Sequence, residues 1–199
     1  MGLGVLAIPI AAFAFWVWTW GKDIPYINQE PGQRWREKAR QAARKRSKAL
    51  DQSSIAWKAG EKGTAKTLSE RGKQFGRQVD RYNERAAKEI FLNLNARYYE
   101  DPPVKIDLHG LFVNEALIYA QGHIDRCRQE GVGETKIITG RGNNSKDGIA
   151  KIKPAVEGLL IREGLGDKYV WENEGAMVVT VPIVERKPFV SRDSGCTIM

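Results

Sequence analysis

The distribution of hydrophobic and polar residues divides the chain into three segments. Residues 3–20 contain no charged side chain, residues 33–95 are polar with a partial apolar stripe at helical spacing, and residues 104–181 alternate short apolar runs with amphipathic stretches. Two consecutive prolines, Pro102 and Pro103, precede the last segment, and such a pair favours extended backbone over helix. We therefore expect a domain boundary at these prolines.

The last segment has the pattern of a small α/β domain. Two apolar stripes at helical spacing begin at Val113 and Val156 and lie between short apolar runs. The runs predict strands at Val104–Leu108, Lys136–Ile138, Tyr169–Trp171 and Met177–Val181. The resulting order is β-α-β-α-β-β, which predicts a two-layer α/β sandwich at residues 104–184.

The first helical stripe of this domain contains two side chains that often carry chemistry. Cys127 lies on the apolar stripe, so we interpret it as a small core residue and not as a nucleophile. His123 lies beside the stripe, and we expect it to face solvent. Gly131 and Gly133 predict the end of the helix.

The middle segment predicts two helices. Residues 33–50 and 63–95 consist mostly of good helix formers without proline, and Gly60 and Gly63 mark a turn between them. Two such helices can pack as a hairpin, which we assign to a basic helical domain at residues 30–97.

The apolar start predicts an uncleaved membrane anchor at residues 1–21. Its 18 uncharged residues lie within the range of roughly 17–25 that spans a bilayer, and Trp16, Trp18 and Trp20 cluster at one end. A buried core helix or a wrongly assigned start codon would also account for this stretch. Because basic residues follow it, we expect the body of the protein to face the cytosol, at a membrane whose organelle the sequence does not identify.

The net charge of +8 is concentrated in the first half of the chain. Residues 21–100 contain 19 Lys and Arg against 10 Asp and Glu, whereas the remainder is almost neutral. The densest cluster is Arg34, Arg36, Lys38, Arg40, Arg44, Lys45, Arg46 and Lys48. Such a cluster is either a solvated face or a surface for the phosphates of nucleic acid or anionic lipid. We take Arg44, Lys45 and Arg46 as candidate nucleic-acid contacts.

The two cysteines, Cys127 and Cys196, form neither a disulfide framework nor a zinc-binding spacing. This usage weakly favours a reducing compartment. We expect no metal site, no cofactor and no small-molecule cofactor partner.

The candidate chemistry begins at Asp107 and His109, at the end of the first predicted strand. Residues two apart on a strand share one face, so a carboxylate and an imidazole would lie side by side as a possible acid–base pair. The alternative is that both side chains only cap the helix that follows and bind its backbone.

A second polar motif, Gly140-Arg141-Gly142, follows the second predicted strand. Glycines at such a turn can expose backbone N–H groups, and an arginine adds a fixed positive charge, a combination that suits a phosphate. Tight strand-to-helix turns need glycine in any case, so the motif alone is weak evidence. Its place beside Asp107 and His109, at the ligand-binding edge of an open α/β sheet, strengthens it.

With these motifs the sequence resembles the Smr (small MutS-related) domain over about residues 104–184. The resemblance rests on Ile106–Leu111, on Ile137–Gly142, on Lys153–Val156 with Leu159 and Leu160, and on Asn173 with Gly175. The upstream helices are similar to a helical domain of unknown function that often precedes Smr in eukaryotic proteins. The residues that match it are Ala56, Trp57, Gly60, Ala65, Lys66, Leu68, Ser69, Gly72, Asn83, Ala86, Ala87, Ile90 and Phe91.

The resemblance implies an α/β sandwich, nucleic-acid binding and, in several members, endonuclease activity, some of it on messenger RNA. It places the family's Asp-x-His pair at Asp107 and His109 and its Gly-x-Gly loop at Gly140 and Gly142. Asn144 stands where eukaryotic members often have a histidine. If that histidine shares in proton transfer, this protein binds without cutting or cuts slowly.

The tail, residues 185–199, is expected to be flexible and ends in Cys-Thr-Ile-Met. Cys196 in this pattern predicts farnesylation, unless the cysteine is there by chance. A single lipid chain holds a membrane only marginally, so a second signal is expected.

The sequence thus predicts a membrane-tethered, cytosol-facing Smr-domain protein that binds nucleic acid and acts as an endonuclease. RNA is favoured over DNA as its ligand and substrate, although the sequence does not decide between the two. The rival hypothesis is a non-catalytic RNA-binding or scaffold module at a membrane surface.

Overall fold

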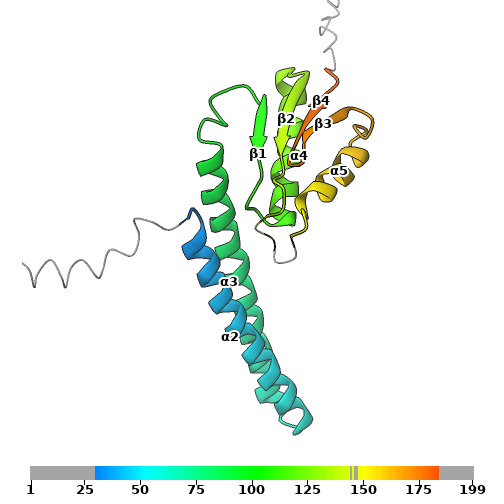
Figure 1. Ribbon diagram of the computed structural model, residues 1–199. Helices are drawn as coiled ribbons and strands as arrows, with labels where there is room; N and C mark the ends of the chain where they lie inside the picture. The colour runs from blue at the N-terminus through cyan, green and yellow to red at the C-terminus, as the bar shows by residue number, and fades with distance from the viewer. Residues whose placement is uncertain (1–29, 144, 146–147, 184–199) are drawn as a thin grey trace, which may run out of the picture. The chain divides into compact units, whose positions relative to one another are not determined.

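The computed structural model describes residues 30–143, 145 and 148–183, and the chain divides after Ala86 into two compact units. The elements are α2 (Gln33–Lys58), α3 (Lys62–Leu94), β1 (Lys105–Asp107), α4 (Val113–Glu130), β2 (Glu134–Ile138), α5 (Ile152–Arg162), β3 (Tyr169–Asn173) and β4 (Ala176–Thr180) (Figure 1). The predicted membrane anchor at residues 1–21 and the tail at 185–199, with Cys196, lie outside the described residues. None of the described helices combines the length and the hydropathy needed to cross a membrane.

In the first unit α2 and the greater part of α3 form the predicted hairpin, joined at Gly60 with a left-handed φ of 83°. The first helix continues to Lys58, beyond the predicted end at residue 50. The polar stretch Asp51–Ser54 suggested an earlier end by its low helix propensity. The seven-residue spacing of buried Ala42, Ala49 and Ala56 carries the helix through it.

Small residues line the contact between these helices. Ala39, Ala42, Ala49 and Ala56 of α2 are buried, as are Ala65, Gly72 and Ala86 of α3. Two polar bonds add to this packing, from Ser53 Oγ to the Ala65 carbonyl at 2.7 Å and from Arg36 to Asn83 Oδ1 at 3.0 Å. The large polar side chains of the hairpin are thereby left at its surface, which explains why its apolar stripe is so sparse.

The second unit is the predicted α/β sandwich. Its four strands lie in the order β1-β2-β4-β3, with β1 and β2 parallel and the other neighbouring pairs antiparallel. The strand ends differ from prediction by up to two residues, and the turn between β3 and β4 consists of Glu174 and Gly175. Because β1 and β2 are parallel neighbours, their carboxyl ends lie at the same edge of the sheet, as the sequence predicted.

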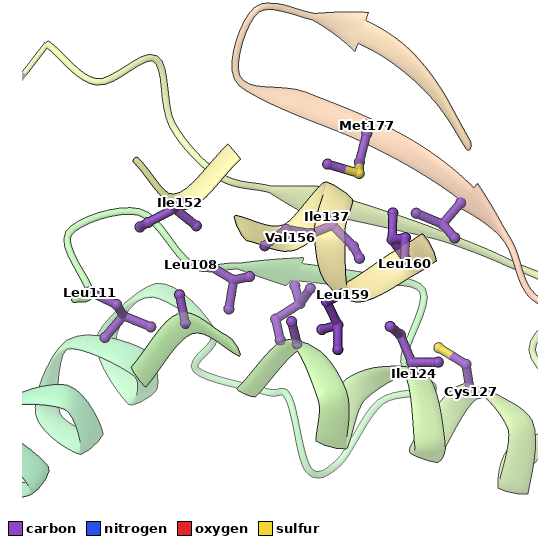
Figure 2. Close-up of a cluster of buried hydrophobic side chains, with 14 of the residues drawn as sticks. Leu108, Leu111, Ile124, Cys127, Ile137, Ile152, Val156, Leu159, Leu160 and Met177 are labelled. Atoms are coloured by element: carbon purple, nitrogen blue, oxygen red, sulfur yellow. The ribbon is translucent and has the colours of Figure 1, made fainter. Parts of the chain in front are cut away.

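The core lies between one face of the sheet and the helices α4 and α5. Ile106, Ile137 and Met177 of the strands belong to this core. Figure 2 shows Ile137 and Met177 with Ile124 of α4 and Val156 of α5. Cys127 is fully buried in this cluster, and burial raises the pKa of its thiol. The prediction that Cys127 is a core residue is therefore confirmed.

The prediction that His123 faces solvent is wrong, because this imidazole is fully buried. Its Nε2 lies 2.7 Å from Thr135 Oγ1, which in turn donates to the Pro103 carbonyl at 2.9 Å. Thr135 has a single hydrogen to donate, so His123 Nε2–H is the donor to Thr135 and Nδ1 accepts from the Tyr98 hydroxyl at 3.1 Å. Polar partners at both ring nitrogens allow a buried histidine at a position that periodicity assigns to the surface.

Several side chains of the sandwich hold the segment between α3 and β1 in place. His123 and Thr135 bond Tyr98 and Pro103 of this segment. Arg126 donates to the carbonyls of Tyr98 and Asp101, the latter at 2.8 Å, and its guanidinium lies over the Tyr98 ring. Cys127 adds a bond to the Pro103 carbonyl. The segment therefore belongs to the α/β unit, in agreement with the division of the chain after Ala86.

Candidate active site

Asp107 and His109 form a hydrogen-bonded pair at the end of β1. Asp107 Oδ1 accepts from the ring Nδ1 of His109 at 2.7 Å and from the backbone N–H of the same residue at 3.1 Å. A carboxylate can only accept, so Nδ1 carries the proton and Nε2 has a free lone pair. The aspartate side chain is 16% exposed and the histidine side chain 49%. The arrangement holds the imidazole in one tautomer and leaves its reactive nitrogen open to solvent.

The glycine loop lies against this pair. Gly140 has a left-handed φ of 76°, and a Cβ placed on it would lie 3.1 Å from the Cβ of His109. The left-handed conformation favours glycine at this position, and a larger residue would also push against the side chain of His109. The structure thus brings the two polar motifs together at one edge of the sheet.

The turn between β3 and β4 supports the same loop. The Gly175 carbonyl accepts from the backbone N–H of Thr139 at 2.8 Å and of Gly140 at 3.1 Å. The N–H of Gly140 is consequently occupied within the protein. Among the described residues, the N–H groups of Arg141 and Gly142 have no acceptor. The loop therefore offers fewer donors to a phosphate than the sequence suggested.

Arg141 and Gly142 complete the loop. The Arg141 side chain is 60% exposed, and its Nε is 3.9 Å from Glu174 Oε2, which leaves the guanidinium able to bind an anion. A Cβ on Gly142 would lie 2.5 Å from the backbone nitrogen of Ala150, so any larger residue would displace the chain that leads into α5. Asn144 and Cys196 lie outside the described residues.

The basic candidates lie in the other compact unit. Arg44, Lys45 and Arg46 are exposed on α2, and as consecutive helical residues they point in different directions. Arg46 lies along α3, with its Cδ and Nε within 4 Å of the position of a Cβ on Gly76. Arg44 and Lys45 have no carboxylate at ion-pair distance among the described residues.

Two residues near the pair were not singled out from the sequence. Lys105 precedes Asp107 by two positions on β1, is exposed, and leaves the sheet on the same face. Asn95, beyond the end of α3, bonds the backbone of Asp107. A lone asparagine at a helix end carries no signal of such a role, whereas the alternation along β1 could have identified Lys105.

The fold and these motifs define a class of protein, a small α/β sandwich with a carboxylate–imidazole pair and a glycine turn at the carboxyl ends of two parallel strands. A family model for the Smr domain matches residues 106–181, and a domain of unknown function (DUF1771) matches residues 33–95. The chain belongs to the Smr-domain family, a nucleic-acid-binding family, and the resemblance seen in the sequence is confirmed.

Known relatives share both parts of the chain. An Smr domain-containing protein of Schizosaccharomyces pombe is 36% identical over 154 residues, which cover 77% of this chain and 72% of that protein. A Saccharomyces cerevisiae protein named Endonuclease NBR9 is 32% identical over 164 residues, 82% of this chain and 67% of that one. The solution structure of the B3BP Smr domain matches with a TM-score of 0.41 and 35% identity, over 50% of this chain and 96% of that one.

Proposed function

We propose that this protein is an RNA endonuclease in which His109 moves the proton and Asp107 orients the imidazole. The observation that carries the proposal is the 2.7 Å bond between Asp107 Oδ1 and His109 Nδ1, which leaves Nε2 as an exposed base. A positioned base of this kind contributes roughly 10²–10⁴-fold to a reaction rate.

In the proposed reaction His109 Nε2 takes the proton of a ribose 2′-hydroxyl. The 2′-oxygen attacks the adjacent phosphorus, the bond from phosphorus to the 5′-oxygen breaks, and the leaving oxygen takes a proton from water. The hydroxide that remains takes the proton held by His109, which restores the neutral imidazole. The products are a 2′,3′-cyclic phosphate and a free 5′-hydroxyl. If His109 instead activates a water molecule, the reaction is hydrolysis and does not need the 2′-hydroxyl.

The surroundings of the pair suit a phosphodiester. Arg141 and the backbone N–H groups of Arg141 and Gly142 are donors for phosphate oxygens, and Lys105 adds positive charge on the face of Asp107. The relative named an endonuclease spans both the helical part and the Smr part of this chain, which supports the same reaction class.

The test is cleavage of an end-labelled RNA by the full-length chain, with His109→Ala and Arg141→Ala purified identically. We expect loss of cleavage in the first variant at unchanged RNA affinity, and weaker binding in the second. A substrate with a 2′-deoxy nucleotide at the cut site separates the two chemistries, because it blocks only transesterification. Equal cleavage by wild type and His109→Ala would refute the proposed role.

The rival proposal is a nucleic-acid-binding module without catalysis. It is supported by Asn144, at the position where the resemblance expects a histidine. The variant Asn144→His decides between a slow nuclease and a binder. Cleavage that appears or increases in the variant favours the nuclease, and intact RNA binding without any cleavage in both proteins favours the binder.

Membrane association, with the body on the cytosolic side, is a further part of the proposal. Its support is the sequence of residues 3–20, the basic residues after them and the pattern around Cys196. Cell fractionation of wild type, of a variant lacking residues 3–20 and of Cys196→Ser tests it. A protein that stays in the soluble fraction in all three forms would contradict it.

A further inference from the structure

Asn95 follows the last residue of α3, and its side chain reaches strand β1. Its Oδ1 accepts from the backbone N–H of Asp107 at 2.8 Å, and its Nδ2 donates to the backbone carbonyl of Asp107 at 2.9 Å. One planar amide thereby makes the two bonds that a residue of a neighbouring strand would make.

These bonds satisfy groups that β2 does not reach. β1 is an edge strand, and its bonds to β2 come from the residues on either side of Asp107, such as Leu108 N–H to the Ile138 carbonyl at 2.8 Å. The N–H and carbonyl of Asp107 therefore point away from the sheet. Asn95 therefore holds the backbone groups of Asp107 on the outer side, while β2 holds the neighbouring residues of the strand on the inner side.

Asn95 is itself fixed. Its Nδ2 also donates to the Phe91 carbonyl at 3.0 Å. Phe91 is 1% exposed, stacks on Tyr119 with a ring-centroid distance of 4.0 Å, and meets Tyr98 edge-on at 5.0 Å. The packing of Phe91 therefore fixes the end of α3, and with it the position of the Asn95 amide beside β1.

We propose that Asn95 is a positioning residue for the Asp107–His109 pair. By holding the Asp107 backbone it keeps Oδ1 where it accepts both bonds from His109 and so keeps the imidazole in one tautomer. Asn95 lies outside the match to the Smr domain, at the last residue of the match to the preceding helical domain. Asn95 nevertheless belongs to the same compact unit as Asp107 and His109. The expected effect on kcat rests on the proposed function, whereas the expected effect on the His109 tautomer does not.

The experiment compares full-length wild type with Asn95→Ala, Asn95→Asp and Asn93→Ala. Asn93→Ala removes an exposed asparagine of α3, two residues before Asn95. Asn95→Asp keeps the size and the acceptor of Asn95 and loses the donor, so it tests the contact even if the alanine variant is poorly folded. The measurements are imidazole ¹⁵N shifts, cleavage kcat, and affinity for a 2′-deoxy RNA that cannot undergo transesterification.

The chain has two histidines, and His123 is an internal control for His109. The structure holds His109 as the Nδ1–H tautomer and His123 as the Nε2–H tautomer, so their ¹⁵N shifts differ. In both Asn95 variants we expect His109 to become a tautomer mixture while His123 is unchanged. We expect kcat to fall by about tenfold to a hundredfold with RNA affinity within about twofold. Asn93→Ala should match wild type in all three measurements.

An Asn95 variant that loses thermal stability but keeps the wild-type His109 tautomer and kcat would show a merely structural role and overturn the inference. If wild type cleaves no RNA, the proposed function fails by itself. The ¹⁵N shifts still decide whether Asn95 positions the pair.

Discussion

Gly140 and His109 come from different motifs, and they meet so closely that a Cβ on the glycine would lie 3.1 Å from the Cβ of the histidine. Gly140 also has a left-handed backbone, with φ of 76°. The glycine therefore serves two purposes, since it allows the turn after β2 and leaves room for the imidazole of the pair.

We predict that a comparison of Gly140→Ala with Gly131→Ala separates the cost of the left-handed backbone from the effect of the contact with His109. Gly131 ends α4 with a similar φ of 71°, but a Cβ there would have no neighbour within 4 Å. Both variants should lose roughly 1–2 kcal/mol of unfolding free energy from the left-handed backbone. Only Gly140→Ala should also displace His109 and reduce RNA cleavage, by about tenfold or more. Denaturant unfolding and cleavage assays measure both effects, and equal cleavage in the two variants would contradict the prediction.

Much of the site could be predicted because its residues follow short, regular elements. The short runs Val104–Leu108 and Lys136–Ile138 identified two strands. The parallel pairing of β1 with β2 brought Asp107, His109 and the glycine loop to one edge. The local chemistry of Asp107 and His109 follows from their spacing of two.

Other parts depend on contacts between residues far apart in sequence. Asn95 acts on Asp107 from the end of another element, and nothing in its own neighbourhood indicates this. Periodicity placed His123 at the surface, but Tyr98 and Thr135 supply it with partners inside. Gly175 occupies the N–H of Gly140, a bond that depends on the packing of the β3–β4 turn. Hydrophobic patterns depend only on residues that are near one another in the sequence. They therefore do not reveal hydrogen bonds between residues that are far apart in it.

The buried His123 predicts that acid destabilises this protein. Burial lowers the pKa of its imidazole to about 4, whereas the ordinary value is 6.5. Between pH 6.5 and 4 the unfolded chain binds a proton that the folded protein does not, so protons favour unfolding and stability falls as the pH is lowered. From pH 7 to pH 5 we expect this residue to account for a loss of about 2 kcal/mol.

The variant His123→Gln isolates this effect, because an amide keeps a donor and an acceptor and does not titrate. Denaturant unfolding at several pH values should show a steeper loss of stability for wild type than for the variant between pH 7 and pH 5. Parallel curves would mean that His123 keeps an ordinary pKa in the folded protein.

The hairpin contains a helical glycine, Gly76, whose replacement by alanine should increase the stability of the protein. Gly76 lies inside α3, and a Cβ there would meet only Arg46, at 3.8 Å, which is ordinary contact. We predict that Gly76→Ala stabilises the hairpin by about 0.5–1 kcal/mol, because alanine loses less conformational entropy in a helix. Gly60→Ala is the matched control, since it is also sterically open but has φ of 83°, and it should destabilise by roughly 1–2 kcal/mol. Circular dichroism at 222 nm during denaturant unfolding measures both, and a destabilising Gly76→Ala would indicate tighter helix packing than described.

The exposed cations of α2 predict a change in the salt dependence of RNA binding. Arg44 and Lys45 have no carboxylate partner among the described residues, whereas Arg40 is 3.0 Å from Glu37 and Lys73 is 2.8 Å from Glu70. If Arg44 and Lys45 each neutralise one phosphate, replacing both by alanine should lower the slope of log affinity against log salt by about 1.4 for single-stranded RNA. Arg40→Ala with Lys73→Ala removes the same charge and should change the slope less, because those cations already have partners.

Fluorescence anisotropy between low and physiological salt provides the slopes. Identical slopes in wild type and the Arg44/Lys45 variant would exclude phosphate contacts by these two residues, and binding of both proteins to anionic vesicles would then test the lipid surface instead.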